Sequence, residues 1–147
     1  MVNSTITFHL ITESNIELLQ NFLCLAGNSL STFRYFASRP LTVINNHIIT
    51  VVVTENNQPI GYGHLDKEEV TIWLGIAVCE TSKGRGVGKQ IMRYLINSAR
   101  EKQIDIIDLT VDKINVSAIK LYKKFGFSEV VNNNETSLKM RLSLNDK

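Results

Sequence analysis

The spacing of apolar residues predicts the first elements of the chain. Apolar and polar side chains alternate over residues 5–10, and this period of two indicates a half-buried strand. Apolar residues then recur at helical spacing over residues 16–23, behind a capping-box pattern at residues 14–17 and ahead of a stop signal at Gly27. Residues 28–46 mix aromatic, aliphatic and arginine side chains, and we expect one or two short helices and a loop there.

Three strands in succession are predicted next. Residues 47–54 are apolar and β-branched, which is typical of a strand covered on both faces. A turn at residues 55–58 leads to a second strand over residues 59–66, and a turn at residues 67–68 leads to a third over residues 69–79. The two tight turns imply an antiparallel meander. Five apolar residues of the third strand share one face, namely Val70, Ile72, Leu74, Ile76 and Val78.

The remaining chain predicts helices that alternate with strands. In order, we expect a glycine-rich loop (83–88), a helix to about residue 102, a strand (104–111), a helix (115–124) and a closing hairpin (127–131 and 135–144). The full predicted order is β-α-α-β-β-β-α-β-α-β-β. We therefore expect an α/β (α+β) fold with a mixed, mostly antiparallel central sheet flanked by helices, in one domain over residues 1–147.

Composition and charge narrow the class of protein without indicating an activity. With 147 residues, 44% of them hydrophobic and 20% charged, the chain can bury a core of its own. The net charge of +2 gives no strong attraction to nucleic acid or to a membrane, and no apolar run is long enough to span one. Residues 1–4 lack the start of an export signal, and Cys24 and Cys79 are expected as small packing residues in a reducing cytoplasm.

The glycine-rich loop has the composition of an anion-binding site. Glycines let a helix N-terminus approach a phosphate closely, and Lys83, Arg85 and Lys89 add positive charge. A P-loop is excluded because only three residues separate Gly84 from Gly88. A dinucleotide fingerprint is disfavoured because the glycines alternate and follow an antiparallel meander. The type that remains has a basic residue followed by x-x-Gly-x-Gly, and the structural alternative is a turn that merely starts a helix.

Residues 115–127 carry a second pattern that points to chemistry. Asn115 and Tyr122 lie seven residues apart, about two helical turns, and so project to similar sides of the predicted helix. Asn115 is also well placed to act only as the cap of that helix, and Tyr122 could be an ordinary core residue. Both structural alternatives stay open from the sequence.

Together these patterns resemble the GNAT superfamily, the Gcn5-related N-acetyltransferases. The resemblance is carried by the strand at residues 73–78, the glycine loop with its helix, and the run ending in Leu-Tyr-Lys-Lys-Phe-Gly-Phe at residue 127. These motifs cover the C-terminal half, and the element order covers the rest. One departure is Lys83, because the family commonly has glutamine or arginine at this first loop position; the contact there is expected to be through backbone.

The resemblance implies acetyl-CoA as the acetyl donor. Strand backbone would pair with its pantetheine arm, loop amides would hold its pyrophosphate, Asn115 would touch the pantetheine or order the helix, and Tyr122 would lie by the thioester sulfur. The implied donor-binding residues are Ile76, Ala77, Val78, Lys83, Gly84, Arg85, Gly86, Val87, Gly88, Lys89, Asn115 and Tyr122.

Acetyl transfer to an amine needs an acid, a proton acceptor and an oxyanion donor. Tyr122 is the expected acid, and a strand N–H within residues 76–78 is the expected oxyanion donor. His64 and Glu80 are candidate bases, with a satisfied sheet histidine and a solvated loop charge as the structural alternatives. Nothing marks Cys79 as an activated thiol, so we expect direct attack in a ternary complex. We expect no metal site.

Acceptor recognition is expected in the N-terminal helices and the closing hairpin, as the resemblance implies. Phe33, Arg34, Tyr35 and Arg39 mix aromatic rings with cations that could pair with an acceptor carboxylate or phosphate; the alternative is aromatic packing with exposed arginines. We expect a small-molecule primary amine, such as a nucleotide-linked amino sugar or an amino acid. A peptide acceptor and a non-catalytic acyl-CoA-binding module are the alternatives. We expect no nucleic-acid or membrane partner, and a homodimer stays open.

Overall fold

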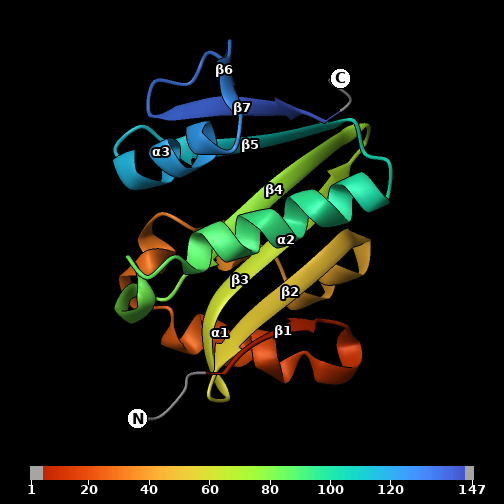
Figure 1. Ribbon diagram of the computed structural model, residues 1–147, viewed down its shortest axis with the longest axis vertical. Helices are drawn as coiled ribbons and strands as arrows, with labels where there is room; N and C mark the ends of the chain where they lie inside the picture. Colours follow the sequence, from red (N-terminus) through yellow and green to blue (C-terminus); the bar gives the residue numbers. More distant parts are fainter. Residues whose placement is uncertain (1–4, 145–147) are drawn as a thin grey trace.

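Seven strands form one sheet in the computed structural model, which describes residues 5–144 (Figure 1). Across the sheet the strands follow the order β1-β2-β3-β4-β5-β7-β6. In chain order the strands and helices are β1 (Ile6–Leu10), α1 (Glu17–Leu25), β2 (His47–Glu55), β3 (Gln58–Glu68), β4 (Thr71–Val78), α2 (Val87–Glu101), β5 (Ile106–Asp112), α3 (Val116–Lys124), β6 (Ser128–Val130) and β7 (Ser137–Ser143). The predicted mixed sheet flanked by helices is confirmed.

The junction between β4 and β5 divides the sheet into two parts. All the other neighbouring strands run antiparallel, whereas β4 and β5 run parallel and, within residues 5–144, pair only between Trp73 and Asp108. Figure 1 shows the two strands meeting near their first residues and then diverging. In the described chain, the later part of β4 therefore has no strand partner on its β5 side.

Each face of the sheet has its own apolar core. α2 and α3 lie on one face, over a core that contains Ile91, and α1 lies on the other, over a core that contains Phe22 (Figure 1). Side chains alternate along a strand, so Tyr62, His64 and Asp66 of β3 point to the α1 face. None of the helices within residues 5–144 has the length and apolarity needed to cross a bilayer.

The segment between α1 and β2 forms 3-10 turns, so the short helices predicted there are 3-10 helices and not a second α-helix. These turns cover Gly27–Ser31, Tyr35–Ala37 and Leu41–Asn46. Gly27 has a left-handed backbone (φ +66°) just after α1, as predicted for a helix stop. Pro40 prevents a longer helix because it has no amide hydrogen and disfavours helical geometry in the residue before it.

Two details near α1 also differ from prediction. The capping box joins Thr12 and Asn15, and not Ser14 and Glu17. Thr12 has the extended backbone that a cap requires, and its own amide donates to Asn15 Oδ1 at 2.8 Å. Cys24 is exposed, so it is not a packing residue, whereas Cys79 is buried as expected.

The turn between β3 and β4 lies two residues later than predicted. The two strands continue to pair as far as Glu68 and Thr71, which leaves residues 69–70 as the turn and satisfies further backbone hydrogen bonds. Val70 is consequently 92% exposed and does not share the buried face of the strand. Residues 1–4, on which the expectation about export rested, lie outside the described part of the chain.

Candidate active site

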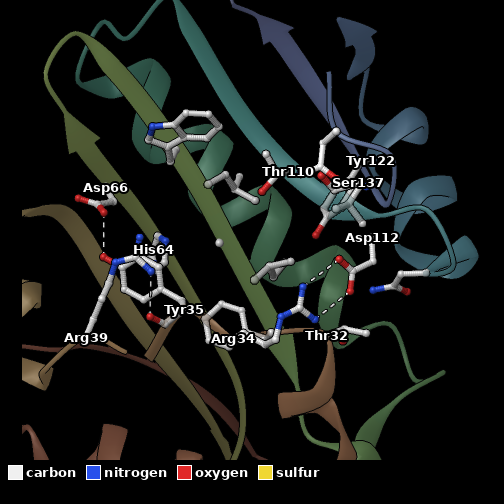
Figure 2. Close-up of a pocket in the computed structure, with 18 of the residues that line it drawn as sticks. Thr32, Arg34, Tyr35, Arg39, His64, Asp66, Thr110, Asp112, Tyr122 and Ser137 are labelled. Atoms are coloured by element: carbon white, nitrogen blue, oxygen red, sulfur yellow. Dashed lines mark hydrogen bonds and ion pairs between the residues drawn. The ribbon is translucent and has the colours of Figure 1, made fainter. Parts of the chain in front are cut away.

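A cavity of about 500 Å³ lies where β4 diverges from β5. Figure 2 shows His64 and Asp66 of β3 on one side of β4 and residues from β5, α3 and β7 on the other, with Arg34 reaching across to Asp112. The sequence-predicted site residues in its wall are Phe33, Arg34, Tyr35, Arg39, His64, Ile76, Asn115 and Tyr122. The structure thus brings the predicted acceptor residues and the predicted acid to one cavity.

Tyr122 and Asn115 reach this cavity from α3. Tyr122 is 7% exposed and packs edge-to-face with Phe127, and burial raises the pKa of its hydroxyl well above 10. The hydroxyl therefore stays protonated at neutral pH. Asn115 caps α3, because its Oδ1 accepts the amide of Ala118 at 3.4 Å. The cap that the sequence left open is thus present, and the same residue also lines the cavity.

The glycine loop lies at the N-terminus of α2 and has the form of an anion site. Gly84 and Gly86 both have left-handed backbone (φ +80° and +83°), with open space around each. Helical hydrogen bonding starts when the amide of Gln90 donates to the carbonyl of Gly86, so the preceding helix amides have no partner inside the helix. A side chain at Gly88 would lie 3.3 Å from Leu121, so glycine there brings α2 close to α3.

Positive charge gathers beside the loop, although not all of it is free. Arg85 is paired with Glu55, with 2.6 Å between Nη2 and Oε2. Lys89 lies next to two other cations, and Lys124, followed by Arg93, lowers the pKa of its ammonium. Cations that repel one another at a helix N-terminus favour a polyvalent anion as their neighbour.

The edge of β4 offers backbone groups toward the cavity. The amide of Cys79 donates to Ile60 of β3, and the carbonyl of Val78 accepts the Ser29 hydroxyl at 2.5 Å on the opposite side. Because backbone direction alternates along a strand, the amide and carbonyl of Ile76 face the same open side as those of Val78. Ile76 also lines the cavity. This is the arrangement that the sequence predicted for the pantetheine arm, with the carbonyl of Val78 already engaged.

His64 lies over Gly75 at the centre of the site. It is 2% exposed, and a Cβ on Gly75 would lie 2.5 Å from its Nε2. Its Nδ1 is 2.6 Å from the hydroxyl of Tyr62, which is fully buried and must donate its hydrogen there. Nε2 then carries the ring hydrogen. Burial, with His47 and Arg39 nearby, holds the pKa of His64 well below 6.5, so the ring is a neutral donor.

A chain of hydrogen bonds runs from β2 to Asp66 along one wall. Thr50 Oγ1 lies 2.7 Å from His47 Nδ1, His47 Nε2 lies 2.7 Å from the Tyr35 hydroxyl, and that hydroxyl donates to Asp66 Oδ2 at 2.8 Å. A carboxylate only accepts, so the directions follow: Thr50 donates to His47, and His47 donates to Tyr35. Burial, followed by the neighbouring Asp66, keeps the pKa of Tyr35 above 10, and burial lowers the pKa of His47 to about 4.

The lowered pKa of His47 predicts a change in stability with pH. Folded His47 stays neutral down to about pH 4, whereas unfolded histidine binds a proton below about pH 6.5. Its contribution is therefore present above pH 6.5 and is lost as pH falls from 6.5 toward 4. In His47→Gln the slope of unfolding free energy against pH in this window should be smaller by about one proton. Urea denaturation at several pH values measures the slope, and an unchanged slope contradicts the neutral histidine.

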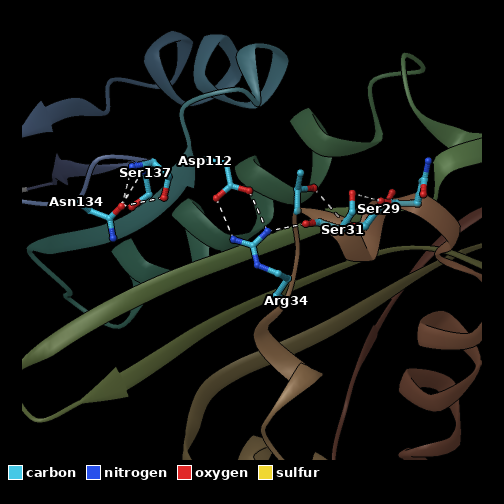
Figure 3. A network of polar contacts seen from close by, with 9 residues as sticks. Ser29, Ser31, Arg34, Asp112, Asn134 and Ser137 are labelled. Atoms are coloured by element: carbon cyan, nitrogen blue, oxygen red, sulfur yellow. Dashed lines mark hydrogen bonds and ion pairs between the residues drawn. The ribbon is translucent and has the colours of Figure 1, made fainter.

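Both predicted acceptor arginines are already paired with carboxylates. Arg34 Nη1 and Nη2 each lie 3.0 Å from an oxygen of Asp112, and Nη1 also donates to the carbonyl of Ser31 (Figure 3). Arg39 stacks over the Tyr35 ring at 4.3 Å and lies 3.9 Å from Glu68. Arg34 would have to open its bidentate pair with Asp112 to bind an acceptor carboxylate or phosphate, whereas the contact of Arg39 with Glu68 is longer and exposed.

Two further candidates lie outside the cavity wall. Glu80 is exposed in a 3-10 turn, and its Oε1 accepts the amide of Asn28 at 3.4 Å. It supports the end of α1 rather than the cavity. Cys79 is buried, and burial raises the pKa of its thiol, which disfavours an acetyl-cysteine. Among the described residues no group of three histidine, cysteine or carboxylate side chains could hold a metal ion.

Comparison with known proteins agrees with this geometry. The family model described as "Acetyltransferase (GNAT) family" matches residues 17–127, which is most of the chain. The chain belongs to the GNAT family. The structure of yncA from Salmonella typhimurium, described with its cofactor acetyl-CoA, has a TM-score of 0.76 at 15% identity and covers 97% of this chain and 96% of that one.

Curated GNAT relatives match over shorter stretches. The [ribosomal protein bS18]-alanine N-acetyltransferase of Haemophilus influenzae is 37% identical over 84 residues, which is 56% of this chain and 56% of that protein. The L-amino acid N-acetyltransferase AaaT of Escherichia coli is 44% identical over 55 residues, 37% of this chain and 34% of that protein. The matches thus span about half or less of these relatives.

The sequence did not identify two carboxylates, Asp66 and Asp112, that the fold brings to the cavity wall. Asp66 directly precedes the turn that the sequence predicts at residues 67–68, yet it is 4% exposed and lines the cavity, because β3 continues to Glu68. Asp112 was not singled out, and its role as the partner of Arg34 depends on a contact between residues 78 positions apart. The alternation of Tyr62, His64 and Asp66 on one face was the available signal for Asp66.

Proposed function

We propose that this protein moves an acetyl group from acetyl-CoA to a primary amine of a small molecule, by direct attack in a ternary complex. The observation that carries the proposal is the position of Tyr122. Its protonated hydroxyl belongs to the same cavity as the open edge of β4 and the aromatic acceptor segment. An acid beside an open strand edge suits a thioester that must release a thiolate.

The residues around the glycine loop fit the donor. Backbone amides from Lys83 to Gly88 would hold its pyrophosphate, with charge support from Lys89. The carbonyl of Ile76 and the amide of Val78, on the open edge of β4, would pair with its pantetheine arm. The donor supplies an activated acetyl group when bound. Asn115 would meet the pantetheine through the part of its side chain that does not cap α3.

The proposed reaction replaces the carbon–sulfur bond of the thioester with a carbon–nitrogen bond and moves a proton at each end. The neutral amine nitrogen forms a bond to the acetyl carbon, the carbon–sulfur bond breaks, the amine loses a proton to water, and Tyr122 supplies a proton to the thiolate. The amide of Ile76 is the proposed oxyanion donor. We propose His64 Nε2–H as a donor that positions the acceptor or its water, because a neutral nitrogen that already carries hydrogen cannot take the amine proton.

Substitution of Gly86 tests the donor site. In Gly86→Ala the left-handed backbone is strained, so the loop amides should lose their arrangement around the proposed phosphate and the Kd for acetyl-CoA should rise about 10-fold. Isothermal titration calorimetry measures the Kd, and circular dichroism checks the fold. Ser98→Ala, at the far end of α2, is the control. An unchanged Kd in a folded Gly86→Ala variant contradicts the proposed phosphate site.

The two base candidates can be separated by pH profiles. Because the pKa of His64 is held well below 6.5, the rise of kcat/KM with pH between about 6 and 9 should follow the acceptor amine and not a histidine. His64→Gln should lower kcat/KM without moving that rise, and Glu80→Gln should leave the profile unchanged. A rise that moves or disappears in His64→Gln would restore histidine as the base.

The proposal itself is tested with purified protein, acetyl-CoA and a panel of primary amines, with free thiol followed over time. We expect amine-dependent thiol release. Acetyl-CoA binding without release on any amine favours the non-catalytic binding module, and release that depends on a peptide amino terminus alone favours the peptide alternative. Absence of acetyl-CoA binding contradicts both the enzyme and the non-catalytic binding module.

A further inference from the structure

We propose that Asp66 forms a subsite for a positively charged group, so that the acceptor carries a second cation besides the amine that reacts. The inference rests on the proposed function, because it names the class of amine for the same cavity. Asp66 lines that cavity and is 4% exposed. Figure 2 shows it beside Tyr35 and Arg39, at the end of the site opposite Tyr122.

One oxygen of Asp66 is held by the protein and the other is open. Tyr35 donates to Oδ2 at 2.8 Å, and the chain through His47 fixes Tyr35 in turn. No described residue donates a hydrogen bond to Oδ1. Every fully buried side-chain oxygen among the described residues does have a hydrogen-bond partner, so Oδ1 is not fully buried. Oδ1 is therefore accessible from the cavity, and its carboxylate is oriented in advance for a ligand.

Asp66 has no direct ion-pair partner among the described residues, although Arg39 lies nearby against the Tyr35 ring. Within residues 5–144 no lysine or arginine forms an ion pair with it, whereas Arg39 pairs with Glu68 and Arg34 pairs with Asp112. The cavity wall thus holds three carboxylates against two guanidiniums, with its histidine neutral. A buried carboxylate without a counter-ion is costly, and a cationic group of the acceptor would relieve that cost.

The sheet register gives the length of the acceptor. Asp66 is level with Trp73 on β4, three residues before Ile76, and three strand residues span about 10 Å. With the reacting nitrogen placed level with Ile76, the proposed oxyanion donor, and about 3 Å allowed for the ion pair, the two nitrogens of the acceptor would lie about 7 Å apart. Six bonds of an extended chain cover that distance, since three backbone bonds cover about 3.6 Å. A nitrogen at each end of a five-carbon chain matches it.

The test uses the full protein, acetyl-CoA and three amines whose reacting nitrogen carries the same five-carbon chain. They are 1,5-diaminopentane, n-pentylamine, which lacks the second cation, and 6-aminohexanoate, which carries an anion instead. We expect kcat/KM to be at least about 10-fold higher for 1,5-diaminopentane than for n-pentylamine, and lowest for 6-aminohexanoate. The preference should lie mainly in KM, because the second cation does not react.

Asp66→Asn tests the residue, and Glu69→Gln in the exposed turn is the control. Asparagine can still accept from Tyr35, so the variant should fold. It should lose about 10-fold in kcat/KM for 1,5-diaminopentane and change less than about threefold for n-pentylamine, whereas Glu69→Gln should change neither. If Asp66→Asn does not fold, the preference of the wild-type protein decides the matter.

The outcomes separate this inference from the function on which it rests. Transfer to amines with no preference for 1,5-diaminopentane, or with a higher kcat/KM for a peptide amino terminus, overturns the cation subsite and leaves acetyl transfer standing. An equal loss for 1,5-diaminopentane and n-pentylamine in folded Asp66→Asn also overturns it. No transfer to any primary amine overturns the proposed function itself.

Discussion

Tyr122→Phe should lower kcat for acetyl transfer about 100-fold or more. The substitution removes the only proton that the buried ring can give to the departing thiolate, and general-acid catalysis contributes about 100- to 10,000-fold. Among the described residues no hydrogen bond to the Tyr122 hydroxyl is recorded, so the fold should not depend on it. Steady-state thiol release with one accepted amine measures kcat.

Tyr94→Phe is the matched control for this experiment. The ring of Tyr94 stacks on that of Phe8, with 4.9 Å between the ring centroids, and lies outside the cavity wall. The kcat of the Tyr94→Phe variant should therefore stay within about threefold of the wild type. The Kd for acetyl-CoA should also be unchanged in Tyr122→Phe, which separates catalysis from binding. A Tyr122→Phe variant with nearly full kcat would show that the thiolate leaves without this acid.

Gly75→Ala should produce the largest loss of stability at the site. The new Cβ would overlap the His64 ring, which cannot retreat, because the rings of Tyr35 and His47 lie 4.4 and 4.6 Å from it. Overpacking of this kind costs about 1–3 kcal/mol of unfolding free energy. Chemical denaturation measures the change, and activity should fall with it because the ring is displaced in the cavity.

A double-mutant cycle shows whether the His64 ring is the cause. In a His64→Ala background the ring is gone, so adding Gly75→Ala should cost less than about 0.5 kcal/mol. The coupling between the two positions would then account for most of the single-mutant effect. An equal cost in both backgrounds would mean that Gly75 is required for its backbone and not for the space it leaves to His64.

The elements with regular periodicity could be predicted from the sequence, because an element that buries one face has apolar residues at a regular spacing. β2 and α2 follow their predicted ranges closely, and Asn115 with Tyr122 reaches the site as their helical spacing indicates. The segment over residues 28–46 could not be predicted in detail. Its 3-10 turns follow the surface of the sheet and of α1, and the spacing of apolar residues within the segment gives no information about the shape of that surface.

The site was predictable where one segment supplies it and unpredictable where distant segments meet. The glycine loop needs only its own backbone and the start of α2, so its motif was sufficient. Arg34 was identified from its type, but its pairing with Asp112 removes it as a free anion-binding group. Asp66 depends on how far β3 continues past His64, and strand ends are set by pairing with β4.

Transfer of an isotopically labelled acetyl group tests the central claim most directly. The protein is mixed with acetyl-CoA labelled in the acetyl carbons and with an accepted amine, and mass spectrometry follows both the amine and the intact protein. Direct attack predicts the label on the amine nitrogen in wild-type protein, little in Tyr122→Phe, and none on the protein at any time. A labelled amine that forms only after a labelled protein, or no labelled amine from any primary amine, would contradict the account.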